Sequence, residues 1–195
     1  MKKSSIIFFA TALGFCFSSC ENTENKDVKT AQVNTSQQQA LSEKEKEFLM
    51  DAAKSNMMEV ELGQLASQKA SSADVKEFGS HMKMQHQKAN DKLMKIAQKN
   101  NVTVPTSLPS DAQSKKENLM ELSGKEFDKK YMKEMVDMHK KDMKKFEEMS
   151  KEAKNPEVKS FAQQTLPTLQ MHYTEANNLD SMMTASEKKK ATSMK

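Results

Sequence analysis

Residues 48–86 read FLMDAAKSNMMEVELGQLASQKASSADVKEFGSHMKMQH, and the spacing of their apolar side chains decides the fold. Apolar or small residues recur every three or four positions on both sides of Ser71-Ser72, which is the period of an amphipathic helix. The stretch therefore predicts a helical hairpin. Its first helix runs from about 42 to 70 and begins with a Ser-Glu-Lys-Glu sequence that resembles a capping box. Its second helix is capped by the two serines and runs to about 100.

The same helical period returns in two more long segments. Asn100-Asn101 and the prolines at 105 and 109 interrupt it, and a shorter helix is expected over about 111–122. A third long helix is expected over about 125–154. Asn155-Pro156 then ends that helix and starts a fourth, because Pro is favoured in the first helical turn. The predicted fold is all-α: over residues 41–183, two antiparallel hairpins are joined by a long crossover containing a short helix, as in a four-helix bundle.

The first twenty residues have the features of an export signal. Lys2-Lys3 precede an apolar run at 6–15, and Ser18-Ser19 precede Cys20. A cysteine directly after two small residues resembles the lipobox of bacterial lipoproteins. This resemblance implies a signal peptide over 1–19 and lipidation of Cys20. An ordinary secretory signal with a coincidental cysteine is the alternative.

Polar segments flank the predicted bundle. Residues 20–40 carry no helical period and predict an acylated, flexible tether that reaches about 25 Å from a membrane. Residues 184–195 predict a disordered basic tail. The expected location is the bacterial cell envelope, with the chain lipid-anchored at a periplasmic or outer-membrane face. The sequence leaves the choice between inner and outer membrane open.

The charge pattern argues against nucleic acid as a partner. The formal net charge is +4, but all 31 basic residues are lysines and the chain has no Trp. Arginine supplies the bidentate contacts to phosphate and guanine, and aromatic side chains supply stacking on bases. Interleaved Lys and Glu are typical of a solvated helix surface. The expected partner is a membrane, through the lipid anchor, and the sequence identifies no protein partner.

The segment HMKMQH, residues 81–86, places four candidate metal ligands in six positions. In a helix each residue turns by about 100°, so Met82 and His86 share the apolar face. His81 and Met84 point away from it. The six residues therefore cannot bind one ion while they are helical, and only Met82 and His86 are expected in the core.

Each long helix carries one titratable residue on its apolar face: Glu59, His86, His139 and His172. All four lie near the middle of their helices, so we expect them to meet at one level of the bundle. One interpretation is a metal site for Zn, Fe, Mn or Cu, with Met82, Met135 and Asp142 as possible auxiliary ligands. The other is a hydrogen-bonded network with a purely structural role.

The segment 48–86, together with LSGKEFDKKYMKEMVDMH at 122–139 and LPTLQMH at 166–172, is similar to the family called domain of unknown function 4142. The resemblance covers about residues 42–180. It implies a ferritin-like four-helix bundle in the bacterial envelope without an established activity. Gln85 stands where the family usually has Asp. No Glu-x-x-His motif occurs, which argues against a carboxylate-rich di-iron site.

Three hypotheses of function follow. The first is a tethered, non-catalytic structural or interaction module. The second is a metal-binding or metal-buffering protein that uses Glu59, His86, His139 and His172. The third and weaker is a metalloenzyme acting on reactive oxygen species. The chain contains 17 methionines, and we expect most of them to fill the core.

Overall fold

The computed structural model describes residues 40–193, and within them every regular element is a helix. The helices are α1 (Glu43–Lys69), α2 (Ala73–Lys99), α3 (Ser110–Glu121), α4 (Gly124–Glu152) and α5 (Pro156–Ser193). The all-α prediction is confirmed, and most helix boundaries lie within two residues of the expected positions. The predicted signal peptide, Cys20 and nearly all of the tether lie outside the described residues.

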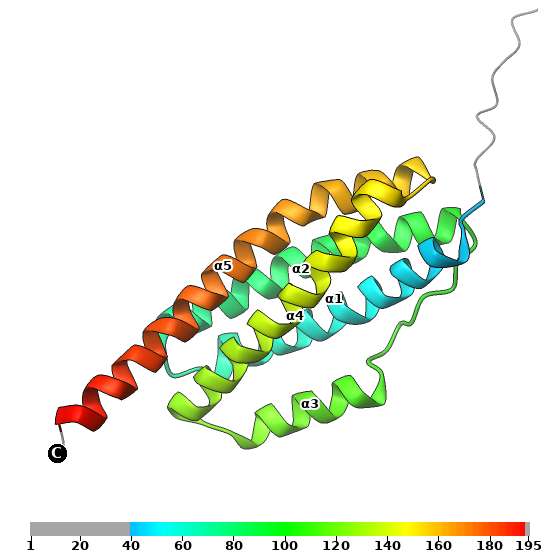
Figure 1. The fold of residues 1–195 in the computed structure, drawn as a ribbon. Coiled ribbons are helices and arrows are strands. Elements are labelled where there is room, and N and C mark those ends of the chain that lie inside the picture. Colours follow the sequence, from blue (N-terminus) through cyan, green and yellow to red (C-terminus); the bar gives the residue numbers. More distant parts are fainter. Residues whose placement is uncertain (1–39, 194–195) are drawn as a thin grey trace, which may run out of the picture. The chain divides into compact units, whose positions relative to one another are not determined.

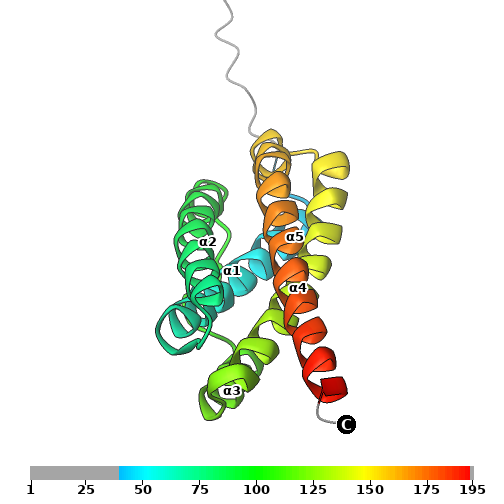
Figure 2. The same cartoon turned by 90° about the vertical axis from the view of Figure 1, so that its left-hand side faces the viewer.

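Helices α1 and α2 form one hairpin, and α4 and α5 form a second (Figure 1). The hairpins pack through α1 against α4 and through α2 against α5. The short helix α3 lies in the connection between the hairpins and contacts the outer side of α1 and α4 (Figure 2). The long helices therefore enclose one common core.

The start of α1 is the capping box that the sequence predicts. The Ser42 hydroxyl accepts from the Glu45 backbone N–H, and the Glu45 carboxylate accepts from the Ser42 N–H at 2.8 Å. Two otherwise unpaired donors at the helix start are satisfied in this way. This local sequence motif therefore determines where α1 begins.

Two glycines bring α1 and α2 into close contact. A Cβ atom on Gly63 would lie 2.6 Å from the Gly79 carbonyl oxygen, and one on Gly79 would lie 2.8 Å from Ala66 Cβ. Neither separation is sterically allowed, so this crossing requires glycine at both positions. The two backbones approach each other here about one turn from Glu59 on α1 and about two turns from His86 on α2.

Two hydrophobic clusters fill the core, and a polar layer separates them. One cluster contains Phe48, Leu93, Phe146 and Phe161, and the other contains Leu62, Phe78, Tyr131 and Ala176. On each long helix, a buried polar residue lies between its contributions to the two clusters. The core is thus continuous hydrophobic packing except at one level near its middle.

Two buried carboxylates link the hairpins at the two ends of the bundle. Glu45 on α1 accepts from the backbone N–H groups of Lys154 and Asn155, at 2.9 and 2.7 Å. Asp128 on α4 accepts from the backbone N–H groups of Ser71 and Ser72, at 2.8 and 2.9 Å. Each hairpin therefore holds the turn of the other hairpin in place.

The final helix is longer than the sequence predicts. Helix α5 continues to Ser193, whereas the predicted bundle ended at 183 and a disordered tail followed. Half of residues 184–193 are Ala or Lys, which favour the helical backbone even without packing. Of the helices within 40–193, none combines the length and the apolar character that a membrane span requires.

Candidate metal centre

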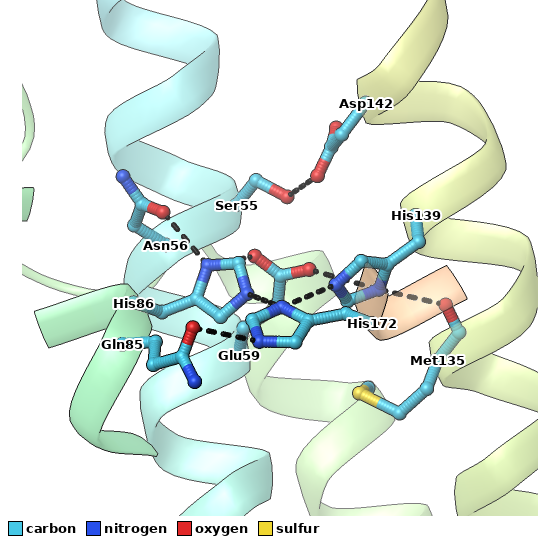
Figure 3. A network of polar contacts seen from close by, with 9 residues as sticks. All are labelled: Ser55, Asn56, Glu59, Gln85, His86, Met135, His139, Asp142 and His172. Carbon is cyan, nitrogen blue, oxygen red and sulfur yellow. Dashed lines mark hydrogen bonds and ion pairs between the residues drawn. The ribbon is translucent and has the colours of Figure 1, made fainter. Parts of the chain in front are cut away.

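The structure brings together the four titratable residues that the sequence placed on the inner faces. Glu59 comes from α1, His86 from α2, His139 from α4 and His172 from α5, and Figure 3 shows their side chains converging. Each is between 0% and 2% exposed. Their helical spacing and similar heights were sufficient to predict this meeting.

One nitrogen of each imidazole points toward the other two rings. His86 Nε2 and His139 Nε2 each lie 3.3 Å from His172 Nδ1. One ligand atom from each of the three histidines lies within 4.8 Å of the other two. We call these three atoms the inner nitrogens. Two nitrogens that bind one tetrahedral ion at about 2.0–2.1 Å lie about 3.3 Å apart, so their spacing suits a single metal ion.

The opposite nitrogen of each ring faces an oxygen atom. His86 Nδ1 lies 2.9 Å from Glu59 Oε2 and 2.9 Å from Asn56 Oδ1. His139 Nδ1 lies 2.9 Å from the Met135 carbonyl oxygen, and His172 Nε2 lies 3.2 Å from Gln85 Oε1. These oxygens act as acceptors, so the outer nitrogens carry the protons and donate. Each inner nitrogen is then left with a lone pair.

Three lone pairs that face one another repel unless a proton or a metal ion lies between them. Burial lowers the pKa of His86 to about 4 and that of His172 to about 3. Burial also lowers the pKa of His139, although the Glu59 carboxylate opposes this effect. Because the rings resist protonation near neutral pH, the arrangement is suited to a metal cation.

Glu59 lies behind the rings, on the side of their outer nitrogens. Its Oε2 contacts His86 Nδ1, and its Oε1 lies 3.5 Å from His139 Nδ1. Burial raises the pKa of Glu59 to about 7, and His139 opposes this shift. The sequence predicts Glu59 as a ligand together with the histidines. In the structure it holds the ring of His86 and lies beside that of His139, where its charge can balance the charge of an ion.

The predicted auxiliary residues take different positions. Asp142 accepts a hydrogen bond from the Ser55 hydroxyl, and its pKa is raised to about 7 by burial and by the charge of Glu59. Met82 and Met135 are completely buried in the cluster around Phe78. Met135 contacts the centre through its backbone carbonyl oxygen.

The helix separates the side chains of residues 81–86 as expected. Met82 and His86 are buried, His81 is partly exposed and Met84 is 61% exposed. The helix therefore places these candidate ligands on different faces, which is the arrangement that the sequence predicts.

Two contributors to the centre were not identified from the sequence. Asn56 supplies an acceptor to His86, and Gln85 supplies one to His172. Asn56 lies three residues before Glu59, so helical spacing could have indicated it. In the sequence, Gln85 stands out only as a departure from a family pattern.

The chain belongs to the family described as Domain of unknown function (DUF4142), whose model matches residues 30–179. The resemblance drawn from the sequence is therefore confirmed. The structure is also similar to the crystal structure of a DUF305 fragment from Deinococcus radiodurans, with a TM-score of 0.64. That match has 13% identity and covers 73% of this chain and 99% of the other, so it shows a shared helical fold alone. No curated protein matches the chain.

Proposed function

We propose that this protein binds one transition-metal ion through His86, His139 and His172. The observation that carries the proposal is the convergence of their inner nitrogens while every outer nitrogen donates to an oxygen atom. Metal-binding histidines in proteins are held in this way, with the second ring nitrogen fixed by a carbonyl or carboxylate group. A structural network would instead use the inner nitrogens as donors and acceptors in pairs.

Three neutral imidazoles favour Zn, Cu, Fe or Ni over hard cations such as Mg and Ca. Glu59 supplies a nearby negative charge, which reduces the cost of placing a cation among buried groups. Three protein ligands also leave one position of a tetrahedral ion for water or a small ligand. We propose storage or buffering of the metal as the role, without catalysis.

The cellular setting that we propose is the bacterial envelope. The residues before Cys20 support cleavage and lipidation there, and the two hairpins with their long connection support a ferritin-like arrangement of the bundle. Replacing Cys20 with Ala should release the protein from membranes after cell fractionation. Wild-type protein found only in the soluble fraction would contradict the anchor.

Metal content tests the proposed binding. The protein is purified without a histidine tag, loaded with Zn²⁺, Cu²⁺ or Co²⁺, desalted and measured for bound metal per chain. We expect about one ion per chain in the wild type and a loss of binding in His139→Ala and His172→Gln. His81→Ala is the matched control, because His81 is the histidine that lies outside the centre, and it should retain the ion.

The variants must also remain folded, which circular dichroism checks by their helical signal. Absence of bound metal in the folded wild type after loading would contradict the proposal. That result would favour the first hypothesis, a membrane-tethered structural or interaction module. Retention of the ion by both ligand variants would also contradict it.

A further inference from the structure

The candidate metal centre has no direct opening to solvent. The three histidines and Glu59 are almost completely buried, so a hydrated ion must pass other side chains to reach them. A carboxylate at the surface end of such a path would lower the cost of removing water from the ion, because carboxylates readily replace water ligands. A carboxylate that serves in this way must lie near the centre and also reach a surface cavity.

A groove between α1, α3 and α4 meets this requirement. It has a volume of about 430 Å³, and its lining includes Ser55, Asp111, Lys115, Asp137 and Asp142. We call it the α3 groove. Asp142 is 9% exposed, which makes it the most deeply buried carboxylate in this lining.

Asp142 and Ser55 lie one helical turn from the centre. Asp142 follows His139 by three residues on α4, and Ser55 precedes Glu59 by four residues on α1, so they lie about 4.5 and 6 Å further along their helices. Because α1 and α4 run in opposite directions, both displacements lead to the same side of the imidazoles. Figure 3 shows Ser55 and Asp142 together on that side, joined by their hydrogen bond.

The two carboxylates are also coupled electrostatically. The charge of Glu59 contributes to the raised pKa of Asp142. An ion held at Asp142 would therefore already interact with the groups of the centre. The other charges facing Asp142 include Lys145, which pairs with Asp51.

Helix α3 covers the groove with weak attachments. Its buried side chains are Ala112 and Leu119, and its ion pairs with the long helices are Lys115–Glu134 and Lys116–Glu61, which are partly exposed. Exposed pairs of this kind contribute less than about 1 kcal/mol each. The cover can therefore open locally without unfolding the four long helices.

We propose that Asp142 is the entry ligand of the metal centre. Its carboxylate takes a divalent cation from the α3 groove and transfers it past Ser55 to the three imidazoles. This inference rests on the proposed function. Gln85 lies on the other partly exposed side of the centre, but its amide is neutral and accepts from His172. It lacks the charge that would draw in a cation.

An entry ligand changes rates without changing the final bound state. Stopped-flow mixing of Co²⁺ with the purified protein measures association through the absorbance of bound cobalt, and a chelator chase measures release. Asp142→Asn should slow association and release by the same factor, about tenfold, and leave the Kd unchanged. Asp142→Glu keeps the carboxylate and should load faster than Asp142→Asn.

Asp91→Asn is the matched control, because Asp91 is an exposed aspartate on α2 outside the groove, and it should load at the wild-type rate. Equal rates for the wild type and Asp142→Asn would overturn the inference while leaving the metal site in place. A weaker Kd with unchanged association would also overturn it, since Asp142 would then act on the bound state. Failure of the wild type to bind Co²⁺ would overturn the proposed function itself.

Discussion

Carboxylates are buried both at the ends of the bundle and in its middle, but their hydrogen-bond partners differ. At the ends, Glu45 and Asp128 accept hydrogen bonds from backbone N–H groups in the turn of the other hairpin. In the middle, Glu59 Oε1 has no hydrogen-bond partner among the described residues. The same is true of Asn56 Nδ2 and the Tyr131 hydroxyl. A polar group is thus fully satisfied in one region and partly unsatisfied in the other.

This difference separates stability from function. A buried carboxylate that accepts several charge-assisted hydrogen bonds stabilises the fold. A buried carboxylate and three imidazoles with incomplete partners cost free energy, and native proteins retain such groups mainly at functional sites. The ends therefore hold the hairpins together, whereas the incomplete partners in the middle support the proposed binding of a ligand there.

The largest expected effect is on stability, at an end. Asp128→Ala removes the acceptor for two backbone N–H groups and the Ser71 hydroxyl, and should lower the free energy of unfolding by about 3 kcal/mol. Urea unfolding measures this loss. Asp137→Ala, an exposed position on the same helix, should change stability by less than about 0.5 kcal/mol. A similar, small effect at both positions would remove the contrast between the ends and the surface.

The same kind of change in the middle should act on binding. Glu59→Gln removes a buried charge, so the metal-free protein should keep its stability or gain up to about 1 kcal/mol. Its metal affinity should fall about 10- to 100-fold, because His86 loses its carboxylate acceptor and the ion loses a nearby negative charge. Urea unfolding without metal and titration with Co²⁺ measure the two effects. A loss of stability as large as that of Asp128→Ala would show that Glu59 is a structural group.

The pH dependence of stability gives a third comparison. Burial lowers the folded pKa of His172 to about 3, so below about pH 6.5 the unfolded chain binds a proton that the folded chain does not. Stability from this group is complete above pH 6.5 and is lost as the pH falls. Between pH 7 and 5, the metal-free wild type should lose about 1–2 kcal/mol more than His172→Gln.

Urea unfolding at both pH values tests this difference. Glu59 and Asp142 have raised pKa values and therefore act with the opposite sign, since their contribution to stability is lost as the pH rises toward 7. Both remain in the variant, so their effect largely cancels in the comparison. Equal losses in the two proteins would show that His172 is protonated in the folded state.

The smallest effect is expected at the edge of the centre. Gln85→Glu places a carboxylate opposite His172 Nε2, which should strengthen that hydrogen bond and raise metal affinity by at most about tenfold. Gln87→Glu, an exposed position on the same helix, should leave the affinity unchanged. Titration with Co²⁺ compares them, and a lower affinity in Gln85→Glu would contradict the assigned role of Gln85.

Much of the candidate site could be predicted, because its residues follow helical periodicity. Glu59, His86, His139 and His172 each lie on the apolar face of their own helix, and similar distances from the turns place them near one level. Periodicity could not reveal that Glu59 lies behind the rings. That arrangement depends on side-chain rotamers and on two neighbouring amides. Asn56 shares His86 Nδ1 with Glu59, and Gln85 accepts from His172 Nε2.

The sequence by itself determined the helices, the capping box at Ser42 and the inward position of the four polar residues, since each depends on residues within one or two turns of one another. Only the tertiary structure decided which nitrogen of each ring points inward, which turn Asp128 holds and which groove Asp142 reaches. These features depend on atoms from different helices, whose separation is set by the packing of the whole bundle. The length of α5 was a further difference, because helix propensity outweighed the lack of an apolar face beyond residue 183.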